Sequence, residues 1–567
     1  MTRSHKTPGA HYWFWAALVA LAASFLSAPG VAQQRALTEG DRLAMLYSPQ
    51  LNFTDRGDPI IRVGLLEGDK SVEFTPSEPI RVMPRGDSSS QVVLPADTTY
   101  TVEIAEEEPG EYQHWVVVAS LQLAQRDNVE EVKEEWSERG YSAESFEVGG
   151  VFGVQGNVFD SRTILMAVGG TDDLEKAESL KDELEATYGI EGQIHSEVTE
   201  YPSGKLTLTG EGVDVEITHP NVLWVKELAG AEDEIRYRIP GIEKSYGEGT
   251  ETRTYTGSLI FAPDKQEGLV AMNALGAERL LRGVVPSEIF ASAPDQALRA
   301  QAVAARSEIF GAVGVRNLAD PYMQRSDVYD QVYGGLEAED ARSNRAVADT
   351  RGEVMFYDDQ VVEAVYSSNA GGFTEDNDKV WDTEPRPYLR GQADAPDEKI
   401  PEGFRDGVSE DELSDFLEDD MPAYSKDAPV GSTRYYRWKT SVGVDRVDQW
   451  LEENDYEVGR IKEAEVIERG VSGRVVRLEL TGTRDKVVIK RELNVRRLFG
   501  DLKSGLFVMD YETDQKGHIK RFEFRGAGFG HGVGMCQTGA AGMADDDYSY
   551  KEILGHYYSG VDLDELY

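Results

Sequence analysis

Two short segments carry residue types that could perform acid–base chemistry on an extended ligand. Glu288 follows Pro and Ser in a predicted turn, between apolar residues and ahead of an alanine-rich stretch. His531 lies in GFGHGVGM, where glycines, which have no Cβ, let another backbone or a polymer approach the imidazole closely. Apolar surroundings disfavour an ionised carboxyl, which raises its pKa and suits Glu288 to general-acid catalysis. The alternative is structural: Glu288 caps a helix or pairs with Arg306.

Three further segments of the same region have patterns that predict local structure. Pro294–Phe310 predicts a helix whose recurring alanines form a narrow, tightly packed face. Tyr366–Glu375, YSSNAGGFTE, predicts a polar strand end and a tight turn. Pro401–Val430 is acidic and interrupted by proline, which predicts a helix and a solvated loop.

The composition favours a soluble protein of several domains and argues against a nucleic-acid ligand. The chain has 567 residues, 40% of them hydrophobic, which at ~150 residues per domain is enough for several cores. The formal net charge is −45, and no basic block stands out, so no nucleic-acid partner is expected. An acidic surface suits high ionic strength, where charges are screened, and we interpret it as salt adaptation.

Residues 1–32 have the pattern of a secretory signal peptide. A basic start precedes the apolar stretch Trp13–Leu26, and Gly30 and Ala32 offer small residues for cleavage. The protein is therefore expected to be secreted, periplasmic or associated with the cell wall. The apolar run is short for a membrane span; the alternative is an uncleaved signal that gives weak membrane association.

An internal repeat occupies residues 111–200. Trp115–Gly140 and Thr163–Gly189 each predict an apolar strand followed by an acidic amphipathic helix. With strands near 145–151 and 192–198, the order becomes β-α-β-β-α-β. This pattern resembles the sporulation-related repeat (SPOR) domain, which implies binding to glycan strands stripped of their peptides. The alternative is an unrelated ferredoxin-like α+β module.

The repeat is flanked by β-rich sequence and a larger mixed region, so we predict a multi-domain α+β protein. Residues 37–110 form a small β region, 201–256 a β-rich connection, and 257–567 one large α+β domain. Ile60–Leu65 predicts a strand that belongs with this large domain.

Four blocks of the large domain resemble, in order, the stage II sporulation protein D / amidase enhancer (SpoIID/LytB) family. The strand at Ile60–Leu65 also resembles the family's opening strand, so the repeat module would be an insertion. The blocks are Leu269–Glu308, Tyr366–Glu375 with Val380-Trp381, Gly526–Ala544 and Tyr550–Gly560.

The resemblance implies lytic transglycosylase activity on peptidoglycan without stem peptides. Glu288 matches the family's catalytic acid. It would protonate the oxygen between N-acetylmuramic acid and N-acetylglucosamine, and then accept the proton of the muramic 6-hydroxyl as a 1,6-anhydro ring closes. Because the nucleophile is internal, a hydrolase's second carboxylate is unnecessary.

Other residues of the matching blocks are candidates for substrate binding or support. Arg306 either tunes Glu288, contacts the glycan, or forms a structural ion pair. His531 either binds substrate or orients Glu288, or it holds the glycine loop by bonds to its backbone. Trp381 and Tyr388 either stack on sugars or are buried. The remaining candidates for hydrogen bonding or close approach are Tyr366, Ser367, Ser368, Gly371, Gly372, Gly532 and Gln537.

No cofactor or metal is expected. The single cysteine, Cys536, cannot form an internal disulfide or supply a cysteine–histidine zinc set, and we expect it to pack beneath the glycine loop with Met535. The expected partners are peptidoglycan strands and a cell-wall amidase. The rival functions are a non-catalytic amidase enhancer and a passive glycan-binding scaffold.

Overall fold

The computed structural model describes residues 39–83, 91–154, 157–190, 192–228, 235–245, 247–381, 383–418 and 421–567. The predicted signal peptide, 1–32, lies outside the described residues. A short helix, α2 (Glu39–Leu46), begins the described chain, and Leu43–Tyr567 form one compact unit. None of the described helices combines the length and the hydropathy needed to cross a membrane.

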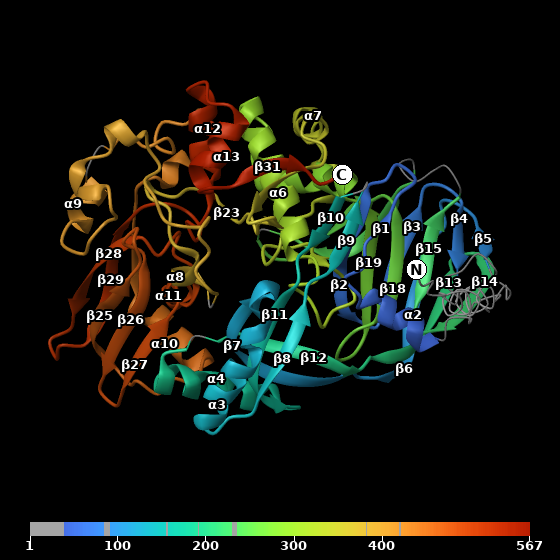
Figure 1. The fold of residues 1–567 in the computed structure, drawn as a ribbon, viewed down its shortest axis with the longest axis horizontal. Coiled ribbons are helices and arrows are strands. Elements are labelled where there is room, and N and C mark those ends of the chain that lie inside the picture. Colours follow the sequence, from blue (N-terminus) through green and yellow to red (C-terminus); the bar gives the residue numbers. More distant parts are fainter. Residues whose placement is uncertain are drawn as a thin grey trace, which may run out of the picture. The chain divides into compact units, whose positions relative to one another are not determined.

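Two sheets take strands from both sides of the repeat region (Figure 1). The first is antiparallel apart from the parallel pair β2–β20, and the second is antiparallel. The first runs β1 (Asn52–Phe53), β2 (Pro59–Asp69), β19 (Leu269–Gly276), β18 (Ser258–Pro263), β15 (Leu223–Glu227), β4 (Ile80–Met83), β5 (Val92–Leu94), with β20 (Gln324–Arg325) beside β2. The second runs β14 (Val213–Pro220), β13 (Ser203–Gly210), β6 (Tyr100–Glu108), β3 (Ser71–Pro76), β16 (Tyr237–Glu243), β17 (Thr250–Tyr255).

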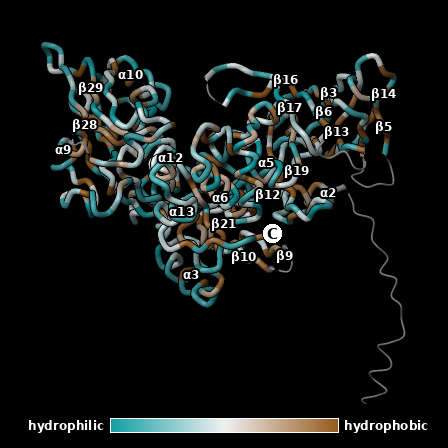
Figure 2. Tube along the Cα trace, turned by 90° about the horizontal axis from the view of Figure 1, so that it is seen from above, coloured by the Kyte–Doolittle hydropathy of each residue, from teal (hydrophilic) through white to brown (hydrophobic). Residues whose placement is uncertain are grey.

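The two sheets pack face to face through alternating apolar residues. Along β3, buried Val72 and Phe74 alternate with exposed or half-buried neighbours. Figure 2 shows hydrophobic and hydrophilic residues mixed over the region of β3, β6 and β13. Phe74 stacks on Phe261 of the other sheet with ring centroids 5.7 Å apart. The described parts of residues 37–110 and 201–256, which the sequence separates into two β regions, therefore build one shared core.

The repeat region forms its own four-stranded sheet, inserted between β6 and β13. The order along the chain is β-α-β-β-α-β, with a hairpin added between the second and third strands. The sheet runs β12 (Ile194–Glu200), β7 (Glu111–Gln122), β11 (Thr163–Thr171), β8 (Ala143–Val148); the helices are α3 (Val129–Glu138) and α4 (Leu174–Tyr188); the hairpin is β9 (Val151–Val154) and β10 (Asn157–Asp160).

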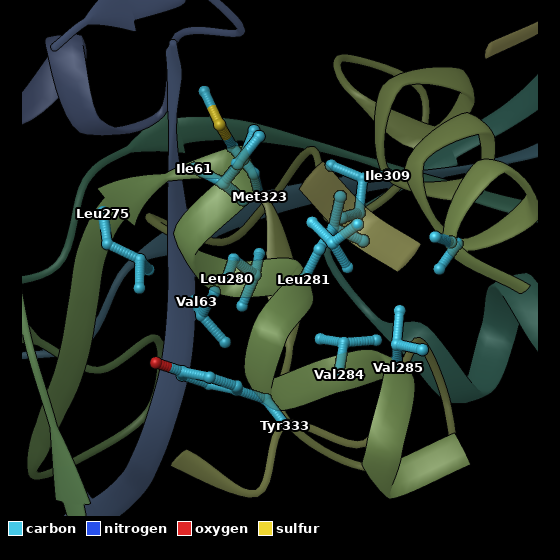
Figure 3. Close-up of a cluster of buried hydrophobic side chains, with 14 of the residues drawn as sticks. Ile61, Val63, Leu275, Leu280, Leu281, Val284, Val285, Ile309, Met323 and Tyr333 are labelled. Carbon is cyan, nitrogen blue, oxygen red and sulfur yellow. The ribbon is translucent and has the colours of Figure 1, made fainter. Parts of the chain in front are cut away.

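Helix α5 (Ala277–Glu288) follows β19 directly and is held by the main core. Figure 3 shows Leu280, Leu281, Val284 and Val285 of this helix gathered with residues of β2 and with Tyr333. Helix α6 (Asp295–Ala312) follows, and its predicted alanine face is fully buried. Small side chains allow close helix approach, and α6 lies beside α12 (Gln537–Asp545) and α13 (Tyr550–Tyr557) in Figure 1.

Short elements connect α6 to the end of the chain. Helix α7 (Ala341–Asp349) packs against α5 and α6. Strand β23 (Tyr366–Ser367) pairs in parallel with β30 (Met535–Cys536), which joins two of the blocks matched in the sequence. A three-stranded sheet closes the region with β22 (Gln360–Val361), β21 (Glu353–Tyr357) and β31 (Asp562–Glu565).

Between β23 and β30 the chain builds two further hydrophobic clusters. One contains Val447, Leu478 and Phe522, and the other contains Phe404, Leu413 and Phe416. In the described part of Pro401–Val430 the predicted helix is present at Leu413–Glu418. Apolar residues of the segment pack on Phe373 and Leu506, whereas most of its charged residues are exposed. The elements are α8 (Asn377–Val380), α9 (Leu413–Glu418), β24 (Trp438–Gly443), α10 (Val444–Glu453), β25 (Ile461–Arg469), β26 (Val475–Gly482), β27 (Lys486–Lys490), α11 (Glu492–Leu498), β28 (Phe507–Thr513) and β29 (Ile519–Gly526).

Candidate active site

Glu288 is the last residue of helix α5. The predicted Pro-Ser-Glu turn is instead the helix's final turn, with Pro286 inside it. The helix ends because Ile289 is extended, although its N–H still donates to Val285 O at 3.0 Å. Buried Val284, Val285 and Ile289 anchor this turn in the core, so the helix end fixes where the Glu288 carboxyl lies.

The surroundings of Glu288 favour its protonated form. Burial raises the pKa of Glu288 to about 7, against the opposing effect of one hydrogen bond from the Val332 N–H. That bond reaches Oε1 at 2.6 Å. The carboxyl also sits at the C-terminal end of α5, where the helix dipole disfavours negative charge. A carboxyl that is protonated near neutral pH can donate a proton to a substrate.

Glu288 lines a cleft of about 270 Å³. Four segments far apart in the sequence meet there: the end of α5 with the two residues that follow it, the residue after β23, the pair Val430-Gly431, and the start of α12. They bring together three residues predicted from the sequence, Glu288, Ser368 and Gln537. The full lining is Glu288, Ile289, Phe290, Ser368, Val430, Gly431, Gln537, Thr538 and Ala541.

Hydrogen bonds tie the polar wall of this cleft together. Ser368 Oγ lies 2.7 Å from Ser432 Oγ. Thr538 Oγ1 donates to Ser368 O at 2.6 Å and accepts from the Ser432 N–H at 3.0 Å. Gln537 Nε2 donates to Oε1 of buried Gln301 on α6 at 3.1 Å. The wall is therefore preorganised, with a hydroxyl and an amide side chain at its surface.

Arg306 forms a buried ion pair with Glu278 and does not bond to Glu288. Its Nε and Nη2 donate to the two carboxylate oxygens of Glu278 at 2.7 and 3.0 Å. Nη1 donates to Glu353 O at 3.0 Å, and Tyr567 Oη donates to Glu278 Oε1 at 2.6 Å. Of the alternatives given above for Arg306, the structure shows the structural ion pair. Arg306 lies opposite Glu278 in the first turn of α5, whereas Glu288 is in the last turn.

His531 likewise has both ring nitrogens engaged by backbone. Nε2 donates to Tyr366 O at 2.9 Å, and Nδ1 accepts from the Val533 N–H at 3.0 Å. Its ring contacts Trp381, with centroids 4.8 Å apart. Burial, with nearby arginines, lowers the pKa of His531 to about 3. It is thus a neutral residue that holds the glycine loop, and it is not part of the lining around Glu288.

The other predicted supporting residues shape the loops behind the cleft. Tyr366 bonds the loop through its carbonyl, and Ser367 is 5% exposed. Gly371, Gly372 and Gly532 have φ of 72°, 105° and 84°, a region in which other residues are strained. A Cβ on Gly532 would also lie 2.2 Å from Arg474 Cζ. None of these five residues is among those that line the Glu288 cleft.

Two aromatic candidates and the cysteine have packing roles. Trp381 covers His531, and Tyr388 is 8% exposed and contacts Tyr357. Cys536 and Met535 are fully buried beneath the loop. Cys536 Sγ accepts from the N–H groups of Ala370 and Gly539, and burial raises its pKa. A buried thiol of this kind is inert.

Sequence reasoning missed Val332, Thr538 and the Val430–Gly431 wall. Thr538 directly follows Gln537, so the adjacent motif was a usable signal. Val332 contributes through its backbone N–H, and no side-chain pattern indicates that. Within the described residues, histidine, cysteine and carboxylate side chains form no group of three or more suited to a metal ion.

Comparisons with known proteins match the region around Glu288. Residues 265–357 match a family described as stage II sporulation protein, and residues 375–534 match a domain of unknown function (DUF8618). The amidase enhancer of Bacillus subtilis is 28% identical over 302 residues, which span 50% of this chain and 40% of that protein. Stage II sporulation protein D of Bacillus amyloliquefaciens is 26% identical, spanning 63% and 88%. An uncharacterized protein of Brachyspira hyodysenteriae is 28% identical, spanning 54% and 72%.

Proposed function

Since this chain belongs to the stage II sporulation protein D / amidase enhancer family, we propose that it is a cell-wall remodelling enzyme outside the cytoplasm. Its reaction is lytic transglycosylation: cleavage of the bond between N-acetylmuramic acid and N-acetylglucosamine in peptide-stripped glycan, with 1,6-anhydro products.

One observation carries this proposal: Glu288 is the single carboxyl group among the nine described residues that line its cleft. A hydrolase uses a pair of carboxyl groups that flank the scissile bond. A transglycosylase needs one, because the substrate's own hydroxyl replaces water. With its one carboxyl group, the lining of this cleft supports a transglycosylase.

The mechanism follows from the environment of Glu288. With its pKa raised to about 7, the carboxyl is protonated in weakly acid conditions and donates to the glycosidic oxygen as the C1–O bond breaks. The resulting carboxylate accepts the proton of the muramic 6-hydroxyl while O6 bonds to C1. The carboxyl is then protonated again, and no water is consumed. General acid–base help of this kind contributes ~10²–10⁴-fold.

The repeat region is proposed to hold the glycan strand. Trp115, Phe146 and His195 form a row of ring contacts, with centroids 5.3 and 4.6 Å apart. Trp115 and His195 are paired across β7 and β12, and Val116, next along β7, packs in the helix-covered core. Because neighbouring strand residues point to opposite faces, the row lies on the face away from α3 and α4.

The rival function is amidase enhancement without catalysis, which one relative's name suggests. Product analysis separates the two. Purified protein is incubated with peptide-stripped peptidoglycan, and the fragments are identified by mass spectrometry. Fragments with 1,6-anhydro ends support the transglycosylase. Reducing ends formed by water would make it a hydrolase, and intact glycan together with stimulation of an added amidase would make it an enhancer.

A further inference from the structure

We propose that Phe290 is the aromatic platform on which an N-acetylhexosamine ring of the glycan stacks beside Glu288. This assignment rests on the proposed glycan substrate, and it names the residue that recognises it. Phe290 lines the same cleft as Glu288, and its side chain is 57% exposed although it follows directly on buried Ile289. A large apolar ring held open to solvent at a site is a feature of ligand recognition.

The backbone beneath Phe290 is fixed on both sides. Ile289 N–H bonds to Val285 O at 3.0 Å, and Phe290 O accepts from the Ala293 N–H at 2.8 Å. Arg342 clamps the same segment, donating to Ala291 O at 3.0 Å and Ala293 O at 2.8 Å. The exposed ring therefore stands on an ordered support, and little conformational freedom is lost when a ligand covers it.

The chemistry of the cleft matches a pyranose ring. A sugar presents C–H groups on its faces and hydroxyl or acetamido groups around its edge. The lining has the same division: Phe290, Val430 and Ala541 are apolar, whereas Ser368 and Gln537 offer a hydroxyl and an amide. Stacking on Phe290 would leave the sugar's edge facing that polar wall.

The other aromatic candidates do not supply this surface. Trp381 contacts His531, and Tyr388 is buried against Tyr357. Phe290 is the one aromatic residue in the described lining of the cleft. Its place two residues beyond the acid would hold a sugar next to the bond that receives the proton, so that Glu288 meets the glycosidic oxygen repeatedly in one geometry.

The test is calorimetric titration with an N-acetylglucosamine hexamer of a full-length parent that carries Glu288→Gln, which prevents cleavage, and Trp115→Ala, which removes the proposed glycan contact of the repeat region. Adding Phe290→Ala is expected to raise the Kd for the hexamer roughly tenfold or more. Adding Phe290→Trp should leave that Kd close to the parent's value. Phe53→Ala, which removes a 42% exposed ring on β1, is the matched control and should change nothing. Thermal unfolding of each variant shows that the fold is kept.

Hexamer binding that is unchanged by Phe290→Ala would overturn the assignment, and so would absence of binding in the parent. The proposed function is judged separately, by products of the Glu288-containing protein. If Phe290→Ala still forms anhydro products with an unchanged KM, the proposed transglycosylase function stands and the stacking role of Phe290 is wrong. If hexamer binding depends on Phe290 but the protein with Glu288 forms no anhydro products, the stacking role stands and the transglycosylase function is wrong.

Discussion

The backbone N–H of Val332 donates to Glu288 Oε1 at 2.6 Å and holds the carboxyl at the end of α5, while burial raises the pKa of that carboxyl to about 7. The two effects on the pKa are opposed, and burial is the larger. The hydrogen bond thus orients the acid without converting it to a carboxylate. Orientation by a backbone group and protonation by burial are what a general acid needs.

The rate is expected to follow protonation of Glu288. Because its pKa is raised from 4.5 to about 7, the acid form persists across weakly acid pH, and kcat/KM should fall about tenfold per pH unit above that pKa. His531, with its pKa lowered to about 3, stays neutral over this range and adds no titration of its own to the pH profile. A pH profile on soluble glycan checks this. A rate that falls on acidification near pH 4.5 would instead show that the ionised form of Glu288 is required.

The Arg306–Glu278 pair is expected to contribute to stability and not to chemistry. Arg306→Met leaves the Glu278 carboxylate buried without its partner, which should cost about 3–5 kcal/mol of unfolding free energy. Urea unfolding measures the loss. The control is Arg299→Met on the same helix, whose pair with Asp349 is partly exposed and should contribute about 1 kcal/mol or less. Equal stability of the two variants, with kcat lost only in Arg306→Met, would place Arg306 in the reaction.

Two glycine substitutions are expected to have opposite effects. At Gly532, φ is 84° and a Cβ would meet the Arg474 guanidinium at 2.2 Å, so Gly532→Ala should destabilise by about 2 kcal/mol or more. At Gly555, inside α13, no atom lies within 4 Å of an added Cβ, so Gly555→Ala should stabilise by roughly 0.5–1 kcal/mol. Thermal unfolding of both compares them. Equal stability of the two variants would contradict the strain expected from a side chain at Gly532.

Salt is expected to improve substrate binding. The chain carries a net charge of −45, and each muramic residue of peptide-stripped glycan carries a free carboxylate. Raising the ionic strength to about 1 M shortens the Debye length to about 3 Å, which removes the repulsion and should lower KM severalfold. The uncharged N-acetylglucosamine hexamer should bind equally at both salt concentrations. Weaker binding of the anionic glycan in high salt would point to a basic binding surface.

The sequence alone predicts Glu288 as a candidate acid, but it does not predict the contacts that surround it. Glu288 stands out because apolar residues flank it, and Ser368 and Gln537 because they lie in blocks whose sequence resembles the SpoIID/LytB family. The partners of Arg306 and His531 depend on how α5, α6 and the glycine loop pack, and no local pattern encodes that. Local patterns also do not show which distant strands pair, so the shared core of the two β regions was not predicted. Pairing of β2 with β19 joins residues on both sides of the repeat, so two stretches that alternate separately share one core.

The central claim is tested most directly by comparing anhydro-end formation by the wild-type protein and by Glu288→Gln on peptide-stripped peptidoglycan at high salt. Gln keeps an oxygen for the Val332 N–H and cannot donate the required proton. The control is Glu457→Gln, at a side chain that is 89% exposed. We expect 1,6-anhydro ends from the wild type and Glu457→Gln, and a loss of at least ~10²-fold in Glu288→Gln. Anhydro ends formed equally by Glu288→Gln would contradict the account.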